Sequence, residues 1–458
     1  AYFSMEYGLT KSLKIYSGGL GILAGDYLKQ ASDSNSNLCA IGLLYRFGYF
    51  AQDLSVWGEQ LSEYIPQNFS YLPMEVVRDE KGEEVIISIA FPGRSVYAKA
   101  WRVPVGRISL YLLDTDIDQN SAEDRGITGK LYGGDSEMRI KQEMFLGIGG
   151  IRLMDRINIK PTIYHCNEGH AAFCGLERLS VYITRHNLDF DVAKELVRTS
   201  TLFTTHTPVP AGHDVFEEHL MRTYLSHYPG RMNISWDDFM NLGKIRHNDP
   251  YEKFSMSVLA TNLSQEVNGV SKIHGRVSRE MFQQMWPGYF AEENHIGYVT
   301  NGVHLPTWAD SSWQRLYKEV LGKDYVDVQS DPEVWAKINN VSDDTIWNIK
   351  KELKHKLTEY LKVKVVEDMQ RRQESPSLII NTIENFNENA LIIGFARRFA
   401  TYKRAHLLFN NIDRLAELLN NPEKPVVFLF AGKAHPNDKA GQDLIKMIIE
   451  TSRRKEFA

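Results

Sequence analysis

Four basic residues lie within eight positions near the end of the chain: Arg397, Arg398, Lys403 and Arg404. They follow an apolar run at 390–395 that is typical of a short buried strand, and leucines at helical spacing come after them. In open α/β sheets ligands bind at the carboxyl ends of strands, and a helix start attracts anions through its free N–H groups and its dipole. We therefore predict a phosphate-type anion site here; a solvated basic turn is the alternative.

Three glycines within four positions form a second candidate anion site. Gly18, Gly19 and Gly21 precede an amphipathic pattern, and glycine lets a backbone turn tightly and bring its N–H groups close to a ligand oxyanion. The segment has neither the spacing of a dinucleotide-binding loop nor the Gly-Lys-Ser/Thr of a P-loop. Taken alone, it predicts either a phosphate-contacting loop or only a tight turn between a strand and a helix.

Polar residues end three further apolar runs, in segments 162–170, 202–210 and 299–308. These residues are Asn167, Glu168, His170, His206 and Asn301. Because strand ends meet at one edge of a parallel sheet, we expect several of these side chains to converge. Amides and imidazoles can both donate and accept hydrogen bonds, which suits recognition of hydroxyl groups. For any single residue, capping of a turn is an equal alternative.

A metal site is the rival interpretation of the same strand ends. Its candidate ligands are His165, Cys166, His170, His206 and His213. No HExxH motif and no pair of histidines four apart on one helix supports it, so we favour hydroxyl recognition.

Strands alternate with helical patterns from residue 161 onward, which predicts a parallel sheet covered by helices. We predict an α/β fold with a first lobe at 1–310, a β-rich insertion in it at about 40–115, and a helical connection at 311–385. A second lobe begins at 386–458 and is cut short, and Ser375-Pro-Ser is expected to be a linker. The chain starts inside a strand-like run and stops in a helical pattern, so we expect a fragment.

Composition excludes several classes of protein. The 458 residues carry 53 basic and 58 acidic side chains, a net charge of −5, and the basic residues are interspersed with acids, which argues against a nucleic-acid-binding surface. The three cysteines have no metal or disulfide spacing, which favours a reducing cytoplasm. No apolar run reaches membrane length and no signal peptide opens the chain.

Six segments, taken together and in order, resemble one family: YSGGLGILAGD, YHCNEGHAAF, TTHTPVPAGHDVF, VNGVSKIHG, VTNGVHLPTW and FARRFATYKR. The chain is similar to the α-glucan phosphorylases that act on glycogen, starch and maltodextrin, especially their shorter bacterial branch. The resemblance implies two Rossmann-like lobes of the B type of glycosyltransferase. It also implies phosphorolysis: inorganic phosphate attacks the terminal α-1,4-linked glucose of a glucan and releases α-glucose 1-phosphate with retention. Members of this family are usually homodimers.

The resemblance assigns roles to the residues that bind phosphate. Gly18, Gly19 and Leu20 resemble the glycine loop whose backbone faces the substrate phosphate. Arg398 and Lys403 resemble the pair that binds inorganic phosphate or the phosphate of glucose 1-phosphate. Neutralising this charge beside an oxocarbenium-like sugar is the catalytic contribution expected of them.

The resemblance also assigns the residues of the sugar pocket. The resemblance counts His206 among the catalytic residues, since it matches the histidine that contacts the glucose 6-hydroxyl and the neighbouring catalytic carbonyl. Asn301 matches an asparagine that holds the same sugar. Asn167, Glu168 and His170 match a turn of the glucose pocket. Glu6 resembles, more weakly, an acid in the pocket wall.

One departure from the family pattern concerns pyridoxal phosphate, the cofactor that the resemblance implies. The family attaches it to a lysine in a Glu-Ala-Ser-Gly-Thr-Ser-x-Met-Lys type of motif, which this chain lacks. We therefore expect the 458 residues by themselves to be inactive. Two other functions stay open: a sugar-nucleotide glucosyltransferase similar to glycogen synthase, and a glucan-binding homologue without catalysis.

Overall fold

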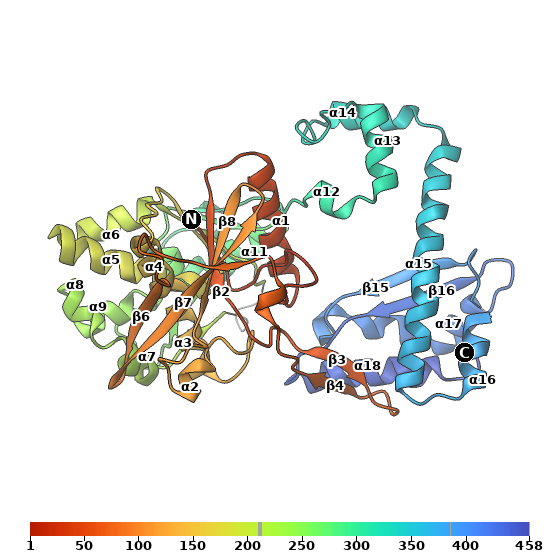
Figure 1. Ribbon diagram of the computed structural model, residues 1–458, viewed down its shortest axis with the longest axis horizontal. Helices are drawn as coiled ribbons and strands as arrows, with labels where there is room; N and C mark the ends of the chain where they lie inside the picture. Colours follow the sequence, from red (N-terminus) through yellow and green to blue (C-terminus); the bar gives the residue numbers. More distant parts are fainter. Residues whose placement is uncertain (209–212, 385, 458) are drawn as a thin grey trace. The chain divides into compact units, whose positions relative to one another are not determined.

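The computed structural model describes residues 1–208, 213–384 and 386–457. These residues form two compact units. The first unit comprises Ala1–Tyr49 and Ile65–His304, and the second comprises Phe50–Tyr64 and Leu305–Ala458 (Figure 1). Residues 50–64 thus group with the second unit, whereas the sequence analysis places them in the first lobe. Each unit is described by itself.

One large mixed sheet forms the centre of the first unit. Its strands are β1 (Tyr2–Phe3), β2 (Cys39–Leu43), β5 (Glu75–Val76), β6 (Ile86–Phe91), β7 (Arg94–Val105), β8 (Ile108–Asp114), β9 (Tyr164–Asn167), β10 (Thr201–Thr204), β13 (Glu266–Gly269) and β14 (Ile296–Tyr298). In the order β14-β13-β10-β9-β1-β2-β8 all neighbours are parallel, and β7, β5 and β6 extend the sheet in antiparallel fashion. This confirms the predicted α/β class with a largely parallel sheet. The strand β13 was not predicted.

The order of strands reverses between β1 and β9. From β1 the chain adds β2 and then β8 on one side, and it later adds β9, β10, β13 and β14 on the other side. Ligands of open α/β sheets bind outside the carboxyl ends of the strands at such a switch point. The topology therefore directs attention to the residues that follow β1, β9 and β10.

Helices in the first unit connect these strands. They are α1 (Gly19–Asp33), α2 (Ala122–Arg125), α3 (Ser136–Met144), α4 (Gly150–Arg156), α5 (Phe173–His186), α6 (Phe190–Thr199), α7 (Glu218–Leu225), α8 (Tyr228–Met232), α9 (Trp236–Asn241), α10 (Met256–Asn262) and α11 (Lys272–Met281). A short pair, β11 (Val215–Phe216) and β12 (Phe254–Ser255), is antiparallel. A β-carbon on Gly25 would lie 2.2 Å from the carbonyl oxygen of Gly8, so glycine lets α1 pack directly on the segment after β1.

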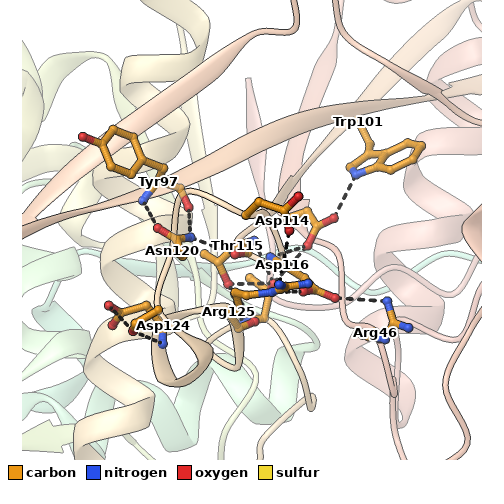
Figure 2. A network of polar contacts seen from close by, with 12 residues as sticks. Arg46, Tyr97, Trp101, Asp114, Thr115, Asp116, Asn120, Asp124 and Arg125 are labelled. Atoms are coloured by element: carbon orange, nitrogen blue, oxygen red, sulfur yellow. Dashed lines mark hydrogen bonds and ion pairs between the residues drawn. The ribbon is translucent and has the colours of Figure 1, made fainter.

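A polar network supports the loop that follows β8 (Figure 2). The indole of Trp101 donates to Asp114 at 3.1 Å, and Asn120 bonds the backbone of Tyr97 and Thr115 through its amide. Its polar atoms bond one another, so we assign this network to the stability of the loop.

The second unit contains a parallel pair of strands with helices around it. Its elements are β3 (Ala51–Leu54), β4 (Gln60–Glu63), α12 (Leu305–Trp308), α13 (Ser311–Leu321), α14 (Pro332–Ala336), α15 (Asp343–Arg371), α16 (Pro376–Glu384), β15 (Leu391–Ala396), α17 (Ile412–Leu419), β16 (Val426–Ala431) and α18 (Lys439–Ser452). The hairpin β3–β4 lies beside α18 (Figure 1). Gln60 joins it to the loop after β16 by accepting from the N–H of Ala434 and donating to its carbonyl, both at 2.9 Å.

Two predictions for the second unit are wrong. The expected linker Ser375-Pro-Ser includes the first residues of α16, where Pro376 is tolerated because it needs no N–H partner in the first turn. The expected buried strand is β15, but Leu391 is 61% exposed and Ile393 is 39% exposed. In the described residues β15 pairs only with β16, and a sheet of two strands buries little surface.

Within the described residues, no helix combines the length and the apolar composition needed to cross a membrane.

Candidate functional site

Three polar residues from three neighbouring strands meet at the switch point of the first unit. Ser4 follows β1, Asn167 ends β9, and His206 lies two residues after β10. Nε2 of His206 is 2.6 Å from Oδ1 of Asn167, and Nδ2 of Asn167 donates to Oγ of Ser4 at 3.1 Å. Asn167 is only 1% exposed. The structure thus brings Asn167 and His206 together, as predicted, and adds Ser4, which the sequence analysis missed.

Glu168 holds the backbone of His206 from the same strand end. Its carboxylate accepts the N–H of His206 at 2.7 Å, while its own N–H donates to the carbonyl of Thr204 at 2.8 Å. Its backbone has φ 76° and ψ 166°, a region almost restricted to glycine that costs about 1–3 kcal/mol. Neighbouring hydrogen bonds hold this strained conformation, which is characteristic of functional sites.

His170 belongs to a buried charged network next to this strand end. It lies in a 3-10 turn, Gly169–Ala171, with Nε2 3.2 Å from Oδ2 of Asp214. Arg139 binds the same carboxylate at 2.9 Å and approaches Glu143 at 3.0 Å. Sequence reasoning missed Arg139 and Asp214; the signal in the sequence was the pair of opposite charges at Arg139 and Glu143, four positions apart, which is the spacing of neighbours on one face of a helix.

The pKa values of Asp214 and Glu143 are shifted in opposite directions. Burial alone would raise the pKa of Asp214, but the charge of Arg139 and the contact with His170 outweigh it and hold that pKa well below the usual range. Burial and then the charge of Asp214 raise the pKa of Glu143 well above its usual range. At neutral pH Asp214 is therefore the main counterion of Arg139.

The glycine segment is connected to the same strand ends through Glu6. The carboxylate of Glu6, 3% exposed, accepts the N–H of Ser17 at 2.7 Å and that of Gly18 at 3.3 Å, and it also bonds the hydroxyl of Tyr132. Ser4 donates to the carbonyl of Glu6 at 2.9 Å. A continuous set of hydrogen bonds thus runs from His206 to the glycine segment.

The first turn of α1 is open. The sequence predicted that all three glycines precede the helix; Gly18 does so as its N-cap, whereas Gly19 and Gly21 lie in its first turn. Gly18 caps the helix without a side chain, and no acidic residue occupies the first turn. A β-carbon on Gly18 or Gly19 would meet nothing within 4 Å. The early N–H groups, including that of Leu20, are left for water or an anion.

Asn301 is exposed and follows β14 at the same end of the sheet, with its N–H donating to Val270 at 3.1 Å. In the described part of the chain no contact joins it to His206. Its role stays a prediction. The motif that contains His206 runs on through residues 209–212, which lie outside the described residues.

The basic segment lies in the second unit. Arg398 is exposed two residues after β15, and Lys403 lies over the ring of Tyr402 at 4.6 Å. The predicted direct opening onto a helix is wrong, because two 3-10 turns, Thr401–Lys403 and Ala405–Phe409, come before α17.

No carboxylate among the described residues lies within ion-pair distance of the four basic side chains at 397–404. Burial and then the positive charge of Arg398 lower the pKa of His435, which follows β16. The loops after β15 and β16 are joined by a hydrogen bond from the N–H of Phe399 to the carbonyl of Lys433 at 2.9 Å. An unpaired positive cluster at two parallel strand ends suits an anion.

The sequence of the chain matches known proteins of one family. The chain matches the family model of carbohydrate phosphorylases over residues 119–454. It is 42% identical to a maltodextrin phosphorylase of Thermococcus litoralis, and 41% and 35% identical to glycogen phosphorylases of Mycobacterium tuberculosis and Aquifex aeolicus, each over its whole length. It spans 53%, 54% and 65% of the lengths of these relatives. The chain belongs to the carbohydrate phosphorylase family.

Proposed function

We propose that the protein containing this chain is an α-glucan phosphorylase, which releases α-glucose 1-phosphate from α-1,4-glucan and inorganic phosphate. The observation that carries this proposal is the set of hydrogen bonds from His206 through Asn167, Ser4 and Glu6 to Gly18. It joins a group suited to a sugar hydroxyl to an open helix start suited to a phosphate. The names of the relatives support the same reaction and the same substrates.

The roles of the residues follow from their chemistry. His206 and Asn301 would bind the terminal glucose, with Asn167, Glu168 and His170 shaping its pocket. In the first unit the backbone at Gly18, Gly19 and Leu20 would contact the phosphate, and in the second unit Arg398 and Lys403 would neutralise its negative charge. The two units would correspond to the two lobes of a B-type glycosyltransferase.

Pyridoxal phosphate is the cofactor expected of this family, and it is held through a lysine amine. The lysines that are buried in the described residues are Lys141 and Lys244. Lys141 pairs with Glu137 at 3.1 Å, and Lys244 donates to the carbonyl of Asp249 at 2.9 Å. Because neither amine is available, these residues do not fit the cofactor, and we assign no step of the reaction to it within this chain.

Glucose 1-phosphate release from maltodextrin and inorganic phosphate tests the proposal, using the full natural polypeptide. Arg398→Ala and Lys403→Ala should each lower kcat/KM about 10- to 100-fold, because a hydrogen bond to a charged group contributes about 1.5–3 kcal/mol. Arg414→Ala is the matched control, since Arg414 lies on α17 of the same unit and pairs with Glu417 at 2.6 Å.

The outcomes separate the alternative functions. Release that is unchanged in both variants would contradict the phosphate role of the basic segment. Glucosyl transfer from a sugar nucleotide without phosphorolysis would favour a glycogen synthase-like enzyme, and glucan binding without either reaction would favour a binding protein.

A further inference from the structure

We infer that Ser4 and Asn167 are positioning residues that hold His206 in one tautomer, with its proton on Nε2 and its Nδ1 free to accept a hydrogen bond. The inference about the sugar rests on the proposed function; the inference about the tautomer does not. The tautomer follows from the hydrogen bonds that connect the ends of β1, β9 and β10, because each donor in this series requires an acceptor as its partner.

The hydroxyl of Ser4 has its single proton committed. Its Oγ is 2.9 Å from the carbonyl oxygen of Glu6, and a carbonyl can only accept. Towards its other neighbours, the side chain of Asn167 and the N–H of Glu6 at 3.3 Å, Oγ must therefore accept. Ser4 is fully buried, so water does not offer its hydroxyl another partner.

The state of Ser4 decides which end of the Asn167 amide faces it. Only the NH2 group of an asparagine can donate, so Nδ2 faces Ser4 at 3.1 Å. Oδ1 then faces His206 at 2.6 Å, and because Oδ1 can only accept, Nε2 of His206 must carry the proton. A flipped amide would place two donors against each other or two acceptors against each other, at a site where Asn167 is 1% exposed.

The imidazole of His206 is kept neutral by its surroundings. Burial lowers its pKa, and His274 and His170 act in the same direction, while the carboxylate of Glu168 opposes them. A neutral ring with its proton on Nε2 leaves a lone pair on Nδ1. Within the described part of the chain Nδ1 makes no hydrogen bond.

This arrangement determines the kind of group that His206 recognises. A group that meets Nδ1 must donate a hydrogen bond, so a hydroxyl fits, whereas an ether, a fluorine or a deprotonated phosphate oxygen does not. The carboxylate of Glu168 fixes the backbone of the same histidine at 2.7 Å. Side chain and backbone are thus held independently, and His206 acts as a preformed hydroxyl acceptor.

Nitrogen NMR of the protein labelled with 15N in its histidine rings tests the tautomer. The His206 signals are identified by their loss in His206→Gln. At pH 7 we expect a protonated-type shift at Nε2 and an unprotonated-type shift at Nδ1. Asn167→Ala and Ser4→Ala should introduce the Nδ1–H tautomer, because the acceptor is removed in the first and the amide is free to flip in the second.

Asn167→Asp is the conservative variant. It retains an acceptor at Oδ1, so the Nε2–H tautomer should persist, while the added charge raises the pKa of His206. Asn268→Ala is the matched control, since Asn268 lies one residue before the end of the next strand, β13, and bonds Thr204 and not His206. This control should leave the His206 signals unchanged, and equal melting temperatures would show that the variants are folded.

An Nδ1–H tautomer in the wild-type protein, or a tautomer that is unchanged in folded Asn167→Ala, would overturn the inference. A second readout concerns the sugar: the wild type should prefer α-glucose 1-phosphate to its 6-fluoro analogue at least tenfold in kcat/KM, and Asn167→Ala should reduce this ratio. The expected NMR result without any phosphorolysis would uphold the positioning role and remove the proposed function.

Discussion

Replacement of Arg139 by methionine would leave one buried and one half-buried carboxyl group, those of Glu143 and Asp214, without their cation. The side chain of Arg139 is 14% exposed, and those of Glu143 and Asp214 are 0% and 24% exposed. Removing one partner of a buried ion pair costs about 3–5 kcal/mol, because an uncompensated charge stays behind. Since Asp214 keeps some contact with solvent, we expect the free energy of unfolding of the first unit to fall by about 3 kcal/mol at pH 7.

The size of this loss should depend on pH. In the wild type the pKa of Asp214 lies below its unfolded value, so its contribution is present above about pH 4 and is lost as the pH falls through the low folded value. In the variant Asp214 keeps His170 but loses Arg139, so burial is opposed less and its pKa rises; each unit of pKa corresponds to about 1.4 kcal/mol. Protonation then relieves the buried charge, so the deficit should shrink between pH 7.5 and pH 5.

The loss of unfolding free energy can be measured for the first unit alone by urea unfolding, followed by hydrogen–deuterium exchange in peptides of α3 and α5. Arg185→Met is the matched control: Arg185 pairs with Asp155, but the two side chains are 57% and 56% exposed, so the change should stay within about 1 kcal/mol. A loss below about 1 kcal/mol for Arg139→Met, or a deficit that grows as the pH falls, would refute this reasoning.

Three further predictions concern packing and protonation. Gly25→Ala should destabilise the first unit by about 1–2 kcal/mol because its β-carbon would meet the carbonyl of Gly8, whereas Gly230→Ala, with nothing within 4 Å, should be neutral or stabilising. Urea unfolding measures both changes, and a reversed ranking of the two variants would contradict this prediction. Gln60→Ala should accelerate hydrogen exchange at Ala434 in the second unit, since two hydrogen bonds are lost; unchanged exchange would contradict the docking of the hairpin. Burial lowers the pKa of His165 to about 3, so its ring signals should not titrate between pH 5 and 8, and a midpoint near pH 6.5 would disprove this.

Local patterns were sufficient for part of the fold and for part of the site, although they did not predict β13. The β-rich segment predicted at about 40–115 contains β7 and β8. Apolar runs that end in amides and imidazoles predicted convergence at the strand ends, where Asn167 and His206 meet. The motifs of the chain were also sufficient for its family, which the match over residues 119–454 confirms. Both inferences rest on patterns among residues that are close together in the chain, and such patterns can be read from the sequence alone.

Only the tertiary structure decided the partners across long separations. Ser4 and Asn167 are 163 positions apart, yet they are in contact because β1 and β9 are neighbours in the sheet. Arg139 and Asp214 are 75 positions apart, yet the guanidinium of Arg139 donates to the carboxylate of Asp214 at 2.9 Å. Likewise, hairpin β3–β4 belongs to a unit whose other residues begin at 305. The periodicity of the sequence predicts which face of an element is apolar, but the order of the strands in the sheet determines which residues that face contacts. By itself the sequence determined the chemistry available at the strand ends, and the order of the strands determined which of those groups became a site.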